Sequence, residues 1–171
     1  MKTKPTAARI YVSTFHKYNN GSIQGAWLDL EDYADRDDFL KACADLHADE
    51  TTPEFMFQDM DGFPEGYASE SNVCADLWGF FALSEFDRGV VAACCAGMGQ
   101  KTSIEDALDA FAGIYASGAV FAEEIANDCG YVPEDMPGWI VIDWEASWRH
   151  NLRHDYVTQG HNGDTYFFRR C

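Results

Sequence analysis

The feature that most constrains this chain is a long acidic stretch with almost no compensating positive charge. Between residues 42 and 150 the only basic residues are Arg88, Lys101 and Arg149, whereas residues 45 to 145 contain 21 Asp and Glu. The whole chain of 171 residues has a formal net charge of −17. Such a stretch repels itself, which costs stability and is tolerated when the field is useful. Solubility or life at high salt is the alternative reason for the same excess.

The chain nevertheless has the composition of a folded protein. Hydrophobic residues make up 47% of it and aromatic residues 15%, whereas disordered acidic segments are poor in both. Its length and apolar content predict a buried core in one domain or a few small ones. The first ten residues do not match a signal peptide, and no run of 18 apolar residues occurs, so we expect a cytoplasmic protein. Most of the six cysteines lie in apolar, helix-like segments and are interpreted as small buried hydrophobic residues.

The first third of the chain alternates between strand and helix patterns. Residues 8–15 and 23–30 have strand character and flank an Asn20-Gly21 pair, which predicts a β-hairpin. A helix is expected to begin at Asp35, with its apolar stripe facing a core. Residues 54–59 then predict a short strand.

The rest of the chain is mainly helical until its last hairpin. The pairs Ser84 with Asp87 and Ser103 with Asp106 resemble capping boxes at two helix starts, the second leading into a helix through Ile104, Leu108, Phe111 and Tyr115. A helix at about 117–129 should end at Gly130. The last helix is predicted from Trp144, Trp148 and Leu152, preceded by residues that are strand-like or lead into this helix. The segments 156–158 and 165–169 flank Asn162-Gly163 and predict a second hairpin.

These elements place the chain in the α+β class, with a β-hairpin or small sheet plus a helix at each end and a helical bundle in the middle. The predicted domains are an N-terminal α+β domain at 1–66, a helical middle domain at 67–116 and a C-terminal α+β domain at 117–171.

Patterns that carry catalytic chemistry are weak in this sequence. His150 and His154 would share a helix face but lack a specified third metal ligand, and Asp59–Gly62 departs from a calcium loop at Phe63. The chain has no GxSxG nucleophile motif and no glycine-rich nucleotide-binding loop. We therefore predict a protein that is not an enzyme, has no metal site and needs no cofactor. The acidic charge also argues against direct binding to nucleic acid.

What remains is the acidic surface itself, which we predict to bind a basic DNA-binding channel of another protein. Duplex DNA carries about one charge per 1.7 Å of axis, so 29 acids match roughly 50 Å of duplex, and two chains roughly 100 Å. The electrostatic field of this surface would speed its association with the partner, and binding would weaken strongly as the salt concentration rises. The acidic residues predicted to form this surface are Asp38, Asp45, Asp49, Asp59, Asp61, Glu70, Asp76, Glu85, Asp87, Glu105, Asp106, Asp109, Glu123 and Glu124.

Several blocks resemble the ArdA antirestriction proteins, which conjugative plasmids, transposons and phage carry. These blocks are IYVSTFHKYNNGSIQGAWLDLEDY at 10–33, EFMFQDMDGFP at 54–64, VFAEEIANDCG at 120–130 and WIVIDWEASWRHNLRHDY at 139–156. The resemblance implies an elongated, curved protein of three small domains that forms a homodimer through its C-terminal domain. It also implies an acidic surface that mimics bent B-form DNA and occupies the DNA-binding groove of Type I restriction-modification enzymes. Their specificity and methyltransferase subunits would be the partners, and incoming mobile DNA would be protected.

The family's antirestriction motif corresponds to NDCGYVPEDMPGWIVID at 127–143, and the resemblance places it near the dimer interface. Its acids are Asp128, Glu134, Asp135 and Asp143. Two alternatives remain open at this point. One is a hydrolase with a carboxylate or His-metal site, which would need a pocket holding His150, His154 and an acid. The other is a DNA mimic directed at a different DNA-binding protein.

Overall fold

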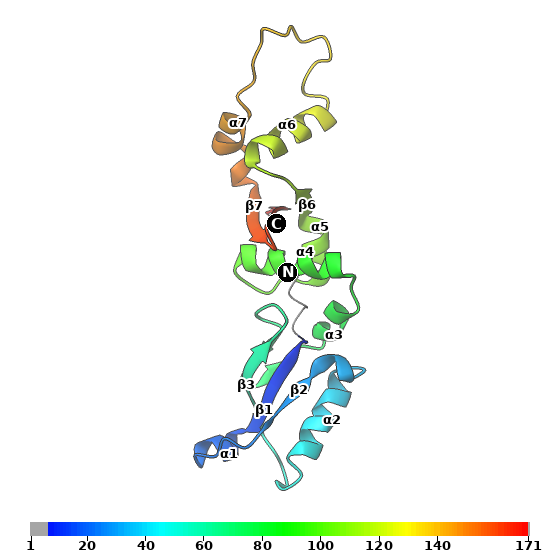
Figure 1. Cartoon of the computed structure of the whole chain (residues 1–171), viewed down its shortest axis with the longest axis vertical. Coiled ribbons are helices and arrows are strands. Elements are labelled where there is room, and N and C mark those ends of the chain that lie inside the picture. The colour runs from blue at the N-terminus through cyan, green and yellow to red at the C-terminus, as the bar shows by residue number, and fades with distance from the viewer. Residues whose placement is uncertain (1–6, 171) are drawn as a thin grey trace. The chain divides into compact units, whose positions relative to one another are not determined.

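The computed structural model describes residues 7–170. It divides into two compact units, Met1–Arg88 and Gly89–Cys171, which are described separately as unit 1 and unit 2. Both combine helices with small antiparallel sheets, which confirms the α+β class (Figure 1). The division into domains at 1–66, 67–116 and 117–171 stays a prediction.

Unit 1 is built on a three-stranded antiparallel sheet in the order β2-β1-β3. Its elements are β1 (Arg9–Thr14), α1 (Phe15–Asn19), β2 (Ala26–Asp29), η1 (Leu30–Asp32), α2 (Arg36–Leu46), β3 (Phe55–Asp61), β4 (Ala68–Ser69), β5 (Asn72–Val73), α3 (Asp76–Phe81) and the first turn of α4 (Glu85–Met98).

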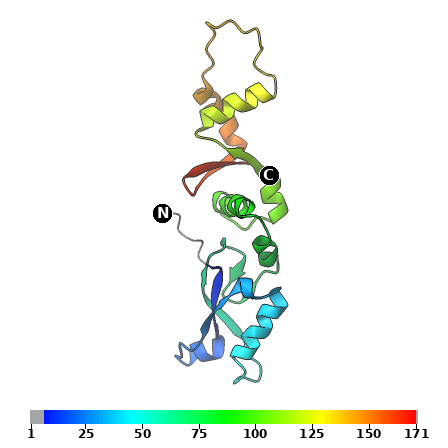
Figure 2. The same ribbon diagram turned by 45° about the vertical axis from the view of Figure 1, so that its right-hand side comes forward.

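Helix α2 lies along one face of this sheet and closes the core of unit 1 (Figure 2). Asp35 caps its N-terminus by accepting a hydrogen bond from the N–H of Asp38, as the sequence predicted. Phe39 of α2 is fully buried, with its ring 6.0 Å from that of Phe57 on β3 and 5.9 Å from that of Trp78 on α3. These aromatic contacts join helix, sheet and α3 into one apolar core.

The first hairpin differs from its prediction in the connection between its strands. Strands β1 and β2 pair antiparallel as predicted, but the connection that contains Asn20-Gly21 begins with a helix, α1, that was not predicted. The hydroxyl of Thr14 accepts from the N–H of Lys17 and caps α1, and Gly21 adopts a φ of 74° just after it. Burial of the Lys17 side chain is the physical reason for the extra helical turn, because it anchors α1 to unit 1. The residues that bury Lys17 are distant from it in the sequence, so the local sequence pattern does not predict α1.

Unit 2 contains a second three-stranded antiparallel sheet, in the order β6-β8-β7. Its elements are the rest of α4, then α5 (Ile104–Ala110), β6 (Phe111–Ile114), α6 (Gly118–Asp128), α7 (Trp144–His150), η2 (Leu152–His154), β7 (Tyr156–His161) and β8 (Asp164–Arg169).

The middle strand of the unit 2 sheet, β8, has buried side chains on both faces. Phe167 of β8 packs with the aromatic rings of α6 and α7, where Phe121 lies 4.7 Å and Trp148 5.4 Å from it between ring centroids. On the opposite face, Tyr166 and Phe168 stack with an interplanar angle of 16°. Because neighbouring residues of a strand point to opposite faces, three consecutive aromatic residues supply both layers of the core.

The prediction of one helix through Phe111 and Tyr115 is wrong. Helix α5 ends at Ala110, and residues 111–114 form strand β6, which pairs with β8. Phe111 packs its ring 5.7 Å from that of Phe168, and Gly113 adopts a φ of 134°, which a helix does not allow. The apolar residues thus have the spacing of a helix, but tertiary contacts with β8 make residues 111–114 a strand.

Other predicted boundaries are confirmed. Ser117 caps α6, and Gly130 follows it with a φ of 69° in the left-handed conformation that often ends helices. Strands β7 and β8 form a hairpin whose two turn residues, Asn162 and Gly163, both have positive φ. Asp143 caps α7, so the segment before Trp144 leads into this helix and does not form a strand. The last helix is shorter than predicted, because Leu152 lies in η2.

Candidate functional site

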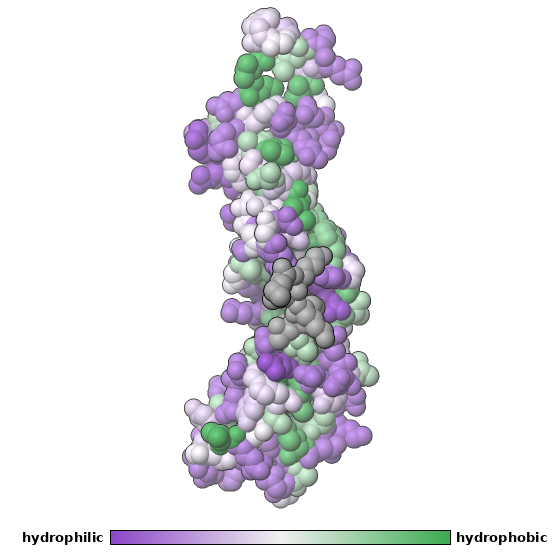
Figure 3. Space-filling model, viewed as in Figure 1, coloured by the Kyte–Doolittle hydropathy of each residue, from purple (hydrophilic) through white to green (hydrophobic). Residues whose placement is uncertain are grey.

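The acidic residues are the most widely distributed candidate functional residues of the described chain. All 29 lie within residues 7–170, where 26 are exposed and Glu50, Asp61 and Asp87 are half-buried. No acidic side chain there is buried, so the negative charge predicted from the sequence is available to a partner. Figure 3 shows hydrophilic residues over much of the visible surface of both units.

In unit 1 the predicted acids lie on several different elements. Asp38 and Asp45 project from α2, Asp49 lies in the turn after it, Asp59 and Asp61 are on β3, Glu70 lies between β4 and β5, Asp76 begins α3, and Glu85 and Asp87 are in the first turn of α4. Asp87 accepts a hydrogen bond from the hydroxyl of Ser84, and the same hydroxyl accepts from the N–H of Asp87. The predicted Ser84 cap is therefore confirmed.

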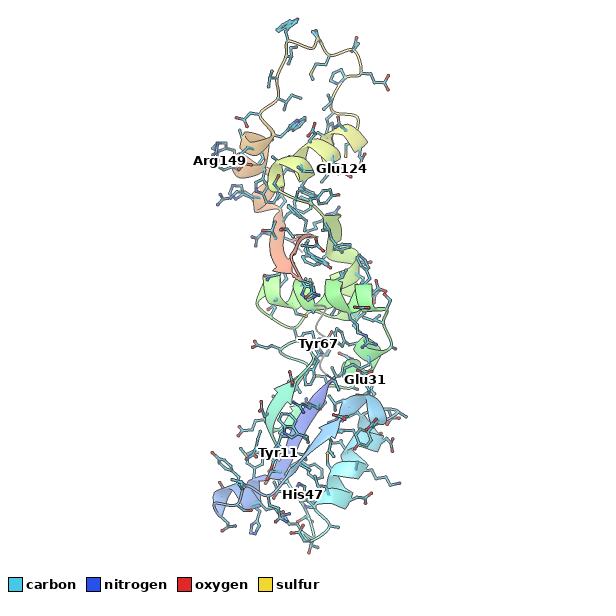
Figure 4. All side chains as sticks on the ribbon, in the orientation of Figure 1. Tyr11, Glu31, His47, Tyr67, Glu124 and Arg149 are labelled. Carbon is cyan, nitrogen blue, oxygen red and sulfur yellow. The ribbon has the colours of Figure 1, made fainter. Side chains whose placement is uncertain are left out.

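In unit 2 the predicted acids lie on two helices and the loop between α6 and α7. Glu105, Asp106 and Asp109 are on α5, Glu123, Glu124 and Asp128 are on α6, Glu134 and Asp135 are in the loop, and Asp143 caps α7. Figure 4 shows Glu124 on α6 and Arg149 on the adjacent α7. Burial, and after it the charges of Glu124 and Asp128, raise the pKa of Tyr115. The field of α6 thus acts on a neighbouring aromatic group.

Few of the acids are tied to a basic side chain by a close ion pair. Among ion pairs in which both partners lie within residues 7–170, four carboxylates have a Lys or Arg nitrogen within 4.0 Å: Glu31 with Arg88, Asp61 with Arg9, and Asp49 and Glu50 with Lys17. The Arg88 and Arg9 pairs are solvent-exposed and contribute little to stability. Most of the negative charge consequently contributes to the external field.

A buried lysine organises the turn that carries Asp49. The Lys17 ammonium lies 2.9 Å from Nδ1 of His47, 2.9 Å from Oδ1 of Asp49 and 3.6 Å from Oε1 of Glu50. Because an ammonium group only donates, Nδ1 of His47 accepts and its Nε2 carries the hydrogen toward the carbonyl of Val12, 3.4 Å away. Figure 4 shows His47 near the end of α2. The hydrogen bond from Lys17 is the main cause that lowers the pKa of Asp49.

Replacing this lysine is expected to destabilise unit 1. Lys17→Met leaves the buried His47 ring without its donor and removes the cation beside Glu50, whose Oε1 keeps its hydrogen bond from the Thr14 hydroxyl. The change should cost about 2 kcal/mol in the free energy of unfolding at neutral pH. Lys41→Met, at an exposed position of α2, is the matched control and should change it by less than about 0.5 kcal/mol. Urea unfolding of both variants measures the difference.

The stability that Lys17→Met loses relative to the parent protein should depend on pH. A carboxylate whose folded pKa is lowered contributes stability that is present above its unfolded pKa and lost as the pH falls through the folded pKa. Asp49 is that carboxylate, so the stability difference between the parent protein and Lys17→Met should shrink as the pH falls below the ordinary pKa of an aspartate, about 4. His47 and Glu50 also face Lys17 in this cluster. A difference that grows in acid would contradict this account.

The loop between α6 and α7 combines acids with exposed apolar side chains. Tyr131 is 77% exposed, Trp139 81% and Val141 88%. Figure 3 shows hydrophobic residues beside hydrophilic ones at the end of unit 2 that carries this loop. Large apolar side chains gathered in one loop are typical of a surface that another molecule covers.

The residues considered as metal or calcium ligands lie on α7, η2 and β3. His150 ends α7 and His154 ends η2, and both are exposed. Among residues 7–170 no group of three or more His, Cys, Asp or Glu side chains is placed to hold a metal ion. Asp59 and Asp61 lie on β3, and Gly62 after them turns with a φ of 85°.

The cysteines follow their prediction in part. Cys43, Cys94 and Cys95 are buried, whereas Cys74 is half-buried and Cys129 is exposed. Burial raises the pKa of the Cys43 thiol to about 12, which disfavours the reactive thiolate. Cys171 lies outside the described residues. Within residues 7–170, no helix is both long enough and apolar enough to cross a membrane.

Sequence reasoning missed one part of the surface. The face of the unit 1 sheet opposite α2 carries the aromatic residues Tyr11 and Trp27, which pair directly across β1 and β2. Strand alternation is the signal that was available, because Ile10 and Val12 are fully buried whereas Arg9 and Tyr11, which alternate with them, are only half-buried. Exposed acids on and just before α2, such as Asp35 and Asp37, were also left out of the predicted surface.

Fold and surface together define an α+β protein whose acidic side chains are presented to the outside across both units. The family model for "Antirestriction protein (ArdA)" matches residues 10–163, so the chain belongs to the ArdA family of antirestriction proteins. Membership supports an antirestriction function and, with it, interaction with restriction enzymes. Neither the curated proteins nor the solved structures contain a match to the chain.

Proposed function

We propose that this antirestriction protein acts as a DNA mimic. Its acidic surface takes the place of B-form DNA in the DNA-binding groove of Type I restriction-modification enzymes, and incoming mobile DNA is protected. The observation that carries this proposal is the exposure of 26 of the 29 acids, distributed over both units. The protein acts in the cytoplasm, catalyses no reaction and binds the specificity and methyltransferase subunits without contacting nucleic acid.

The physical basis is competition for the same cations. A DNA-binding groove presents Lys and Arg to phosphates, and a surface of similar charge density attracts those groups and releases their counterions. The exposed acids of α2, α5 and α6 supply such charges on folded elements, so they need little ordering on binding. Association should be fast at low salt and weaken as salt screens it.

A cleavage assay tests this function. A purified Type I restriction enzyme is given unmodified plasmid with and without the protein at low salt, and cleavage should stop when the protein is in excess. Undiminished cleavage would contradict the proposal and favour a mimic directed at another DNA-binding protein. Degradation of the plasmid or the enzyme by the protein alone would favour a hydrolase.

We also propose that the protein is a homodimer formed through the α6–α7 loop. A second copy would cover Tyr131, Trp139 and Val141, and apolar contacts at the centre of an interface stabilise such a dimer. Val141→Asp should weaken dimerisation at least about tenfold, about 1.4 kcal/mol, because a carboxylate would be desolvated there. Ile23→Asp, at an apolar position of unit 1 that is 89% exposed, is the matched control. Sedimentation over a concentration series measures both, and an unchanged Val141→Asp dimer would contradict this interface.

A further inference from the structure

A second recognition surface lies on the unit 1 sheet, on the face opposite α2. Antiparallel pairing places Arg9 beside Asp29 and Asp61, and Tyr11 beside Trp27 and Asp59. Directly paired residues point to the same face of a sheet. This face, which we call the aromatic platform, therefore consists of Arg9, Tyr11, Trp27, Asp29, Asp59 and Asp61. Ile10 and Val12 alternate with its β1 members and are fully buried on the other face.

The two aromatic rings of the platform are fixed in place. The Tyr11 hydroxyl donates a hydrogen bond of 2.8 Å to the carbonyl of Ile23. A Cβ atom added at Gly25 would lie 2.8 Å from the Tyr11 ring, so the glycine lets the ring lie against the backbone. Trp27 meets the Tyr11 ring edge-on, with centroids 5.6 Å apart at 74°. Such a preformed surface loses little conformational entropy when it binds.

The platform already holds one guanidinium group, from its own chain. The guanidinium carbon of Arg9 lies 4.5 Å from the centroid of the Trp27 ring, and its Nη2 lies 3.5 Å from Oδ2 of Asp61. Within residues 7–170, the buried Nε of Arg9 has no hydrogen-bond partner. Both side chains of the Arg9–Asp61 pair are more than 40% exposed, so this pair is weak and can exchange.

Further carboxylate acceptors surround this group, and Oδ1 of Asp59 already accepts a hydrogen bond of 2.9 Å from the N–H of Met60. Asp29 and Asp59 are exposed on the two strands that flank β1. A planar guanidinium can stack on an aromatic ring and donate two parallel hydrogen bonds to a carboxylate, whereas a lysine ammonium acts as a point charge. The platform therefore fits arginine better than lysine. Proteins that bind DNA use arginine for both phosphate and base contacts.

We propose that the aromatic platform binds an arginine of the partner's DNA-binding surface, which stacks on Trp27 and pairs with Asp29 or Asp59 in competition with Arg9. This inference rests on the proposed function, because it names the side chain by which the partner is held. It adds a preference for arginine that negative charge alone does not give.

Two peptides of equal charge test the proposal on the full chain. One is a flexible Gly-Ser peptide carrying three arginines, and the other carries three lysines at the same positions. The arginine peptide should bind about twofold to fivefold more tightly. In Trp27→Leu this ratio should fall to about 1 while affinity for the lysine peptide stays the same. Tyr18→Leu, at an aromatic residue on α1 that is 54% exposed and lies outside the platform, should keep the ratio.

Two further measurements use the unaltered parent protein and a variant of the competing arginine, Arg9. In the ¹⁵N-labelled parent protein, the indole N–H signal of Trp27 should shift with the arginine peptide and not with the lysine peptide. Arg9→Gln should raise the affinity for the arginine peptide more than Lys41→Gln does. The Lys41→Gln control changes the net charge equally, at an exposed site on α2. Equal binding of the two peptides to the parent protein, or a ratio that survives Trp27→Leu, would overturn the proposal.

The outcomes separate this inference from the proposed function. If the two peptides bind equally but the protein still blocks restriction, the DNA mimic stands and the arginine platform is wrong. If the arginine preference holds but restriction is unaffected, the platform stands and its partner is a different arginine-bearing protein.

Discussion

Neutralising four acids on α5 and α6 together is expected to weaken inhibition of a Type I restriction enzyme by about 30-fold. The variant carries Glu105→Gln, Asp109→Asn, Glu123→Gln and Glu124→Gln, all at exposed positions. Each exposed charge contributes about 0.5 kcal/mol to a contact with a partner cation, so four contribute about 2 kcal/mol. The concentration of protein that halves cleavage measures the effect at fixed, low salt.

The control for that variant keeps every charge. Glu105→Asp, Asp109→Glu, Glu123→Asp and Glu124→Asp change side-chain length at the same positions and should inhibit within about threefold of the parent protein. Each of the four neutral changes made singly should cost no more than about threefold, because a distributed field does not depend on one group. A single change that abolished inhibition would instead indicate a conventional site with one essential carboxylate.

Phe121→Ala is expected to destabilise unit 2 by about 3 to 5 kcal/mol. The Phe121 side chain is fully buried, and its ring lies within 6 Å of the rings of Tyr115, Trp148, Tyr156 and Phe167, counted between centroids. Removing it leaves a cavity between α6 and the sheet, and Gly118, whose added Cβ would overlap Trp148, shows how closely these parts pack. The loss is therefore larger than for a surface residue.

Cysteine alkylation during urea unfolding can assign this loss to unit 2. Cys94 and Cys95 are buried in unit 2 and Cys43 in unit 1, so mass spectrometry of the labelled protein follows each unit. In Phe121→Ala, the two unit 2 cysteines should be labelled at a lower urea concentration. Val120→Ala changes the neighbouring residue, which is 42% exposed, and should cost less than about 1 kcal/mol. A similar small cost for Phe121→Ala would contradict its central position in the core.

Features encoded by short, local chemistry were predictable from the sequence. The serine caps at Ser84 and Ser103, the start of α6 near Ser117, its end at Gly130 and the Asn162-Gly163 turn were all found from neighbouring residues. In each case a side-chain hydroxyl, or a residue that tolerates positive φ, decides the backbone within a few positions. The exposure of the acids was equally predictable, because burying an unpaired carboxylate is costly.

Features that depend on distant contacts were not predictable in the same way. Residues 111–114 form a strand because β8 lies beside them, and α1 forms where Lys17 reaches His47 and Asp49 across the fold. The aromatic platform likewise exists only because three strands with distant sequence positions pair in one register. Local patterns contain Tyr11 and Trp27 but do not show that they face each other.

Displacement of DNA from a Type I methyltransferase, followed by the fluorescence anisotropy of a labelled duplex, tests the central claim most directly. If the acidic surface occupies the DNA-binding groove, the protein should displace the duplex completely at low salt. Its apparent inhibition constant should also rise in proportion to the duplex concentration and increase steeply with salt. A complex in which the enzyme holds the protein and the duplex together would contradict DNA mimicry, and so would failure to displace the duplex at low salt.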